Sequence, residues 1–162
     1  MSHTSTINRI VIKDLVALRA AVAELKRSGM DISMEDGGTP RAYYTNQEGM
    51  GAADHVIRIP GATYDVGVYR SQNGTYELRT DFYNGSVSNV LGATREATEK
   101  AVKDAKATGA EAEQIRSQGQ LGKLYLAYSV NAVEQACARE GKTTQRHTNS
   151  DGTVQIMVAI AA

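Results

Sequence analysis

The sequence predicts an α+β fold, in which a largely antiparallel sheet of about six or seven strands carries two core helices on one face. Two observations support this prediction. Segments with period-two patterning follow one another through tight turns, and two amphipathic segments at helical spacing each end at a glycine. Hairpins outnumber possible crossovers in this order, which favours antiparallel pairing. An Ala-rich helical insertion would be an additional element beside the sheet and the two core helices.

The first part of the chain predicts a strand, a helix and two further strands. Residues 6–13 place apolar side chains on both faces, as a strand inside a sheet does. Asp14 is a residue type that begins helices, because its carboxylate accepts from free amides of the first turn. Apolar residues then recur at helical spacing until Gly29, where we expect the helix to end. Residues 30–35 and 55–59 predict the next two strands.

The strongest local signal is the segment 64–83, which predicts a β-hairpin. Both arms alternate apolar and polar residues, and the Asn73-Gly74 pair between them is typical of a two-residue type I′ turn. One face of this hairpin would be buried and the other solvated. The residues expected on the buried face are Val66, Val68, Leu78 and Phe82.

The second half begins with a helical insertion at 86–119. Within it, residues 94–108 predict a helix with a thin Ala-rich apolar stripe, which would either be a solvated surface helix or dock on a partner. Residues 120–140 carry a wider apolar face and predict the second core helix. A second hairpin around Asp151-Gly152 would close the chain, and its wholly polar arm 143–149 is typical of an edge strand.

Composition limits the protein class. A chain of 162 residues fits one domain, which we expect to span 1–162, and it can bury a core without metals or disulfides. Lys plus Arg equals Asp plus Glu, so the net charge of zero disfavours nucleic-acid binding. One cysteine, Cys137, excludes an internal disulfide. Without a secretory pattern or a long apolar run, the expected protein is soluble, intracellular and cytoplasmic, with no membrane partner.

Motifs for catalysis are missing from the sequence. His3, His55 and His147 stand at no ligand spacing, and neither a nucleophile motif nor a phosphate-binding glycine loop is present. Asp65 and Asp81 lie on opposite arms of the hairpin, on its polar face, where a solvated charge is the default. We therefore predict no catalytic residue, no metal site and no cofactor.

Two surfaces are candidates for contacting a partner, because exposed Tyr and Arg are enriched at protein interfaces. One is the long loop 36–53, which has no periodicity. The other is the polar face of the hairpin. The candidate partner-binding residues on these two surfaces are Arg41, Tyr43, Tyr44, Tyr69, Arg79, Asp81 and Tyr83.

Three blocks of the chain resemble the hypothetical chloroplast reading frame thirty-five family, a domain of unknown function found in algal plastids, cyanobacteria, other bacteria and some phages. The blocks are Met1 to Leu18, the segment YDVGVYRSQNGTYEL from Tyr64, and the Tyr125/Tyr128 helix followed by Gly, a strand, D-G-T and an apolar strand. The resemblance covers the chain except for roughly 85–119. Family members commonly carry a Trp-containing segment where Asp81-Phe82-Tyr83 stands here. The resemblance supports the predicted order of strands and helices and implies no activity, cofactor or catalytic residue. Bacterial members of the family are often encoded near ATPases, which hints at a function as an adaptor protein.

From these observations we expect a non-enzymatic binding or adaptor protein that contacts a protein partner or itself. The edge strand at 143–149 offers a second route, by strand addition. Three alternatives stay open. The first is a nucleic-acid-binding module resting on Arg41, Tyr43, Tyr44, Arg58, Arg70 and Arg79. The others are a homo-oligomeric structural component, such as one of a phage virion, and an enzyme whose site is assembled only in the fold.

Overall fold

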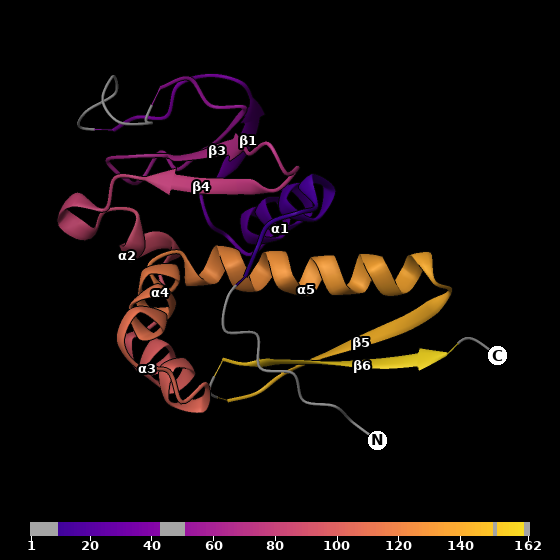
Figure 1. The fold of residues 1–162 in the computed structure, drawn as a ribbon. Coiled ribbons are helices and arrows are strands. Elements are labelled where there is room, and N and C mark those ends of the chain that lie inside the picture. Colours follow the sequence, from indigo (N-terminus) through magenta and orange to yellow (C-terminus); the bar gives the residue numbers. More distant parts are fainter. Residues whose placement is uncertain (1–9, 43–50, 151, 161–162) are drawn as a thin grey trace.

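The computed structural model describes residues 10–42, 51–150 and 152–160 (Figure 1). The helices are α1 (Leu15–Arg27), the 3-10 turn η1 (Tyr83–Gly85), α2 (Ser88–Leu91), α3 (Arg95–Asp104), α4 (Gly109–Gly119) and α5 (Gly122–Arg139). The strands are β1 (Ser33–Asp36), β2 (His55–Arg58), β3 (Val66–Arg70), β4 (Tyr76–Thr80), β5 (Lys142–Thr148) and β6 (Val154–Ile160). The α+β class predicted from the sequence is confirmed.

Strands β1 to β4 form one antiparallel sheet in chain order. Ahead of α1, the described residues 10–13 make a single bridge, from Ile12 to Tyr76 on β4, rather than the strand predicted for 6–13. The remainder of that prediction, residues 6–9, lies outside the described residues. Pairing with β4 does not continue beyond Ile12, because the next two backbone amides, of Lys13 and Asp14, donate to the hydroxyl of Tyr128 on α5 instead.

Strands β5 and β6 form a separate two-stranded ribbon. The described strands therefore make two sheets, and the predicted single sheet of six or seven strands is not found. The reason is α5, an 18-residue helix about 27 Å long at the usual rise per residue, which lies between the sheet and the ribbon (Figure 1). Arg146 fixes the ribbon to the helices through ion pairs with Glu134 on α5 and Glu24 on α1.

Helix α1 begins and ends where the sequence predicts. Asp14 accepts from the amide of Ala17 at 3.1 Å. At the other end, the amides of Gly29 and Met30 donate to the carbonyls of Lys26 and Leu25, which is a Schellman arrangement. This arrangement requires a left-handed residue, and Gly29 has φ +106°.

The turn between β3 and β4 differs from the predicted type I′ turn. Ser71 and Thr75 are paired through backbone hydrogen bonding, and the amide of Gly74 donates to the carbonyl of Ser71, so the loop holds three residues. Gly74 has φ +82°, whereas Asn73 is not among the non-glycine residues with positive φ. A type I turn followed by a left-handed glycine is the usual solution for a three-residue hairpin loop.

The main core lies between the inner face of the sheet and helices α1 and α5 (Figure 1). Val66 and Val68 of β3 are fully buried there with Leu18 of α1 and Leu124 of α5, and Leu78 packs against them partly buried. Phe82 was expected in this core but is 36% exposed. Period-two alternation stops before Phe82, because β4 ends at Thr80 and the chain then turns through η1.

The range 86–119 is helical, but the helix predicted for 94–108 is shorter. Helix α3 ends at Asp104 and α4 begins at Gly109, and the chain turns between them through positive φ angles at Lys106 and at Gly109 itself. The two helices share a small apolar cluster, apart from the main core, made of Val102, Ala107, Ala112 and Ile115. Among the described residues, no helix is long and apolar enough to cross a membrane.

Candidate functional site

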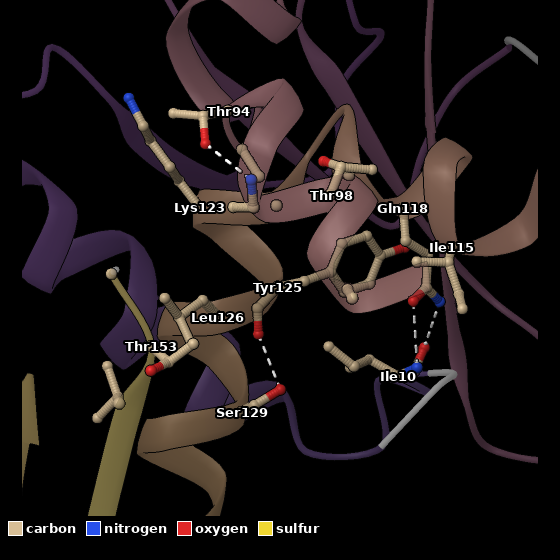
Figure 2. Close-up of a pocket in the computed structure, with 17 residues that line it drawn as sticks. Ile10, Thr94, Thr98, Ile115, Gln118, Lys123, Tyr125, Leu126, Ser129 and Thr153 are labelled. Atoms are coloured by element: carbon tan, nitrogen blue, oxygen red, sulfur yellow. Dashed lines mark hydrogen bonds between the residues drawn. The ribbon is translucent and has the colours of Figure 1, made fainter. Parts of the chain in front are cut away.

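An apolar groove of about 640 Å³ lies where α3 and α4 meet the first half of α5 and the tip of the β5–β6 ribbon. Figure 2 shows its walls: Thr94 and Thr98 come from α3 and its N-cap, Gln118 and Ile115 from α4, and Tyr125, Leu126 and Ser129 from α5. Ile10 and Thr153 close two of its sides. The volume is within the usual range for ligand-binding cavities.

One wall of the groove is the thin alanine stripe of α3. The oxygen of Thr94 accepts from the amide of Ala97 and begins this helix. Val102 packs in the small apolar cluster between α3 and α4. Ala97 and Ala101 line the groove instead, and Ala101 is exposed. The apolar stripe of α3 is therefore divided between an internal contact and an open surface.

Two glycines allow close approaches at the groove: Gly119 at the end of α4 lies against Thr98 of α3, and Gly122 at the start of α5 lies against Ala93, which precedes α3. A Cβ at Gly119 would lie 2.6 Å from the hydroxyl oxygen of Thr98, and a Cβ at Gly122 would lie 2.5 Å from the Cβ of Ala93. Because the same added Cβ would also lie 3.0 Å from the backbone nitrogen of Ala93, a larger residue at position 122 would force backbone movement. The small residues at this junction thus set the spacing of the groove walls.

The side chain of Tyr125 extends from α5 into the groove (Figure 2). Burial raises the pKa of its hydroxyl, and the nearby carboxylate of Glu77 raises it further. The ring stays neutral at physiological pH under these conditions. Tyr125 therefore offers an aromatic face with one polar end, the kind of side chain that anchors protein interfaces.

Several polar side chains around the groove are already bonded within the protein. Gln118 accepts from the amide of Ile10 and donates to its carbonyl. Ser129 donates to the carbonyl of Tyr125, and Thr94 is occupied as the N-cap. Among the described residues that line the groove, Lys123 is the one that carries a charge. The groove can thus bind apolar surface but offers little to orient a polar small molecule.

The outer face of the sheet carries Tyr69 and Arg79, and Asp65, immediately before β3, is the centre of an ionic cluster with Arg41 and Arg58. The prediction that Asp65 lies on a solvated face is wrong, because its carboxylate is fully buried. It accepts from the side chain and amide of Arg41, from Arg58 Nη1 at 2.9 Å, and from the amide of Ile59. Alternation cannot reveal this, because the burial comes from the loop that folds over the sheet.

The surroundings of Asp65 shift its ionisation strongly. Burial alone would raise the pKa of this carboxyl, but the hydrogen bonds from Arg41 and Ile59, with that from Arg58, hold its pKa well below the usual range. Asp65 is therefore ionised at physiological pH. Arg41, predicted to contact a partner, is instead bound to Asp65 and to the carbonyl of Ile59.

Tyr69 and Arg79 lie together on this face, as the hairpin predicts. The guanidinium carbon of Arg79 is 4.4 Å from the centre of the Tyr69 ring. Both also have other contacts, since Arg79 pairs with Glu77 and the Tyr69 hydroxyl donates to the carbonyl of Gly51. The tyrosine ring covers Gly67, where a Cβ would meet it at 2.6 Å.

The remaining predicted contact residues are spread out. Asp81 accepts from the amide of Tyr83 and so shapes the turn after β4. Tyr83 is 66% exposed and is the most open of the described candidates. Tyr43 and Tyr44 lie outside the described residues. The structure thus joins Tyr69 with Arg79 but does not gather the candidates into one site.

A second ionic cluster, which the sequence does not predict, involves His55, Asp36 and Arg19. His55 Nδ1 lies 2.8 Å from a carboxylate oxygen of Asp36, which also pairs with Arg19 of α1. Hydrogen bonds from Arg19 and His55 lower the pKa of Asp36. The cluster joins α1 to the edge of the sheet. Within the described parts of the chain, no group of three or more His, Cys, Asp or Glu side chains is placed to hold a metal ion.

The groove itself was only partly foreseen. The sequence signal for it is the thin apolar stripe of α3, whereas Tyr125 was predicted on the core face of the second helix and Leu126 was not assigned to any face. Leu126 is 41% exposed at the groove. The family resemblance stays a prediction: the chain matches no protein-family model, no curated protein and no solved structure in the comparisons made.

Proposed function

We propose that this protein is a non-enzymatic binding protein that holds a short apolar segment of a protein partner in the groove between α3, α4 and α5. The observation that carries this proposal is the pairing of an open alanine wall with an aromatic anchor. Ala97 and Ala101 line the groove from α3, and Tyr125 and Leu126 line it from α5 (Figure 2). Peptide segments bind such grooves by placing apolar side chains at regular intervals against one face.

The chemistry of the walls favours a protein segment over a small molecule. Small-molecule sites combine apolar walls with a few polar groups that converge on the ligand. Here Gln118 and Ser129 are bonded to the protein itself. The exposed ammonium of Lys123 at the rim would pair with an acidic residue flanking the apolar segment.

The charges of the described residues support this choice over nucleic-acid binding. Arg41 and Arg58 are paired with Asp65, and Arg79 with Glu77. Phosphate binding would have to compete with these carboxylates, and the chain carries no net positive charge to drive it. An enzyme assembled in the fold stays an alternative, and it would need catalytic groups elsewhere than the groove.

A peptide selection tests the proposal. Displayed random peptides are selected for binding to the immobilised protein, and the dissociation constants of the selected peptides are measured by fluorescence anisotropy. We expect apolar peptides with an acidic flank, whose affinity falls at least about tenfold, or 1.4 kcal/mol, in Ala101→Glu. That substitution puts a charge on the groove wall.

The matched control is Ala110→Glu, the same change at an exposed position of α4 that does not line the groove. Affinity for the selected peptides should be unchanged in this variant. Equal losses in both variants, or peptides that bind Ala101→Glu as well as the original protein, would contradict the proposal. Circular dichroism checks that both variants keep the fold.

A further inference from the structure

Strand β6 presents an open edge. In the described part of the chain, its one strand partner is β5, and the ribbon they form stands apart from the four-stranded sheet. A two-stranded ribbon is marginally stable in water unless something else packs on it. Helix α5 covers one side of the ribbon, but Met157 and Val158 of β6 remain 56% and 50% exposed.

The two strands of the ribbon differ in how their edges are protected. Natural edge strands discourage pairing with charged residues, especially lysine. Strand β5 carries Lys142 and Arg146, whereas β6, with the sequence VQIMVAI, carries no charged residue. Strand addition is predicted from the sequence at 143–149, but the edge without charged residues is that of β6.

The backbone of β6 directs hydrogen-bonding groups outward at alternate residues. The amide of Asn149 donates to the carbonyl of Thr153, so this pair is a hydrogen-bonded one. Alternation along an antiparallel ladder then makes Gln155 and Met157 bond toward β5. Ile156 and Val158 consequently direct their amides and carbonyls to the open edge.

We propose that β6 pairs antiparallel with β6 of a second copy of this chain, about a two-fold axis at Met157. The strand is nearly symmetric in chemistry about that residue, because Ile156 mirrors Val158 and both are β-branched. In this register Ile156 faces Val158 of the partner subunit, and these two residues exchange outward hydrogen bonds. With no charge on the strand, two identical copies meet without repulsion.

In a two-fold pairing the same strand edge of both copies forms the interface, and each outward amide donates to the matching outward carbonyl of the other copy. The ribbon would become a continuous four-stranded sheet across the dimer. This inference does not rest on the groove function. Other occupants of the edge, such as residues 1–9 of the same chain or a different protein, would leave the purified protein monomeric.

Analytical ultracentrifugation of matched proline variants tests the pairing. Val158→Pro removes one outward amide, which an edge strand tolerates. Thr144→Pro makes the same change on β5, directly across the ribbon from Val158. We expect the unaltered protein and Thr144→Pro to sediment as dimers that dissociate on dilution, and Val158→Pro as a monomer with an unchanged circular dichroism spectrum. A monomeric unaltered protein at every concentration, or a dimeric Val158→Pro, overturns the proposal.

Disulfide trapping tests the register, and does not depend on how a proline variant folds. In a Cys137→Ala background, Met157→Cys would place two thiols across the axis at a non-hydrogen-bonded pair, where Cα atoms are about 4.5 Å apart. Added oxidant should then give a covalent dimer. Gln155→Cys is the control, because Gln155 faces Ala159 of the partner subunit and not its own copy. Equal cross-linking at both positions, or none at Met157→Cys, overturns the two-fold register.

Discussion

Asp65 shows how a single residue can hold two distant segments together. Its carboxylate joins Arg41, before the undescribed part of the long loop, to Arg58 at the end of β2, and its own amide donates to the carbonyl of Arg41. Because the carboxylate is fully buried while both guanidiniums reach solvent, the desolvation cost falls mainly on Asp65. The hydrogen bonds it accepts offset that cost.

Asp65→Asn is therefore expected to lower the free energy of unfolding by about 3 kcal/mol, because it leaves two guanidiniums without their carboxylate. Urea denaturation at neutral pH measures the change. Asp81→Asn is the matched control on the same hairpin: asparagine keeps an acceptor for the amide of Tyr83, so its effect should stay within about 0.5 kcal/mol. Equal effects in the two variants would show that the buried contacts of Asp65 do not stabilise the fold.

The pH dependence of stability follows from the same contacts. The pKa of Asp65 is depressed in the folded protein, so the unfolded chain takes up a proton first as the pH falls. Its contribution is fully present above about pH 4, the pKa of an unfolded Asp, and is lost as the pH falls further. We expect the free energy of unfolding, measured by urea denaturation from neutral pH into the acid range, to fall less steeply in Asp65→Asn than in the unaltered protein. Parallel plots of this free energy against pH would contradict the linkage.

At the scale of the element, the sequence predicts the ends of helices correctly where neighbouring residues determine them. Asp14 and Gly29 mark the ends of α1 in the sequence because capping involves neighbours within one turn. The Asn73-Gly74 pair predicted a hairpin correctly but not its turn. The same pair suits a type I′ turn and a three-residue loop, and the pairing of Ser71 with Thr75 decides between them.

The caps of α3 and α4 give a matched pair of substitutions. Thr94 accepts from the amide of Ala97, whereas Thr108, at the same position before α4, makes no side-chain capping bond. Thr94→Ala should therefore cost about 1 kcal/mol, and Thr108→Ala clearly less. Thermal unfolding of both variants provides the measurement. A larger loss in Thr108→Ala would contradict the assignment of these caps.

At the scale of the whole molecule, the sequence could not reveal what depends on contacts between distant segments. The groove joins Ala97, Tyr125 and Val154, which lie far apart in the chain. Likewise, alternation in β6 predicts a strand but not that α5 would separate it from the sheet. Asp65 was misplaced for the same reason, since a loop from elsewhere covers it.

The division of the apolar residues into two clusters predicts uneven stability across the molecule. The cluster between α3 and α4 contains four buried residues, all small or medium in size, and lies apart from the main core. We expect amides of α3 and α4 to exchange through a partial opening of lower free energy than amides of α1, α5 and β3. Native-state hydrogen exchange at low urea measures both. Equal exchange free energies would show that the helical pair unfolds only with the whole protein.

The groove is the central proposal, and nuclear magnetic resonance mapping tests it most directly. A peptide selected for binding is titrated into ¹⁵N-labelled protein while amide shifts are followed. We predict that the shifts concentrate at Ala97, Ala101 and Leu126 and saturate together with the binding curve. Shifts concentrated instead at Tyr69 and Arg79, on the outer face of the sheet, would contradict the groove as the binding site.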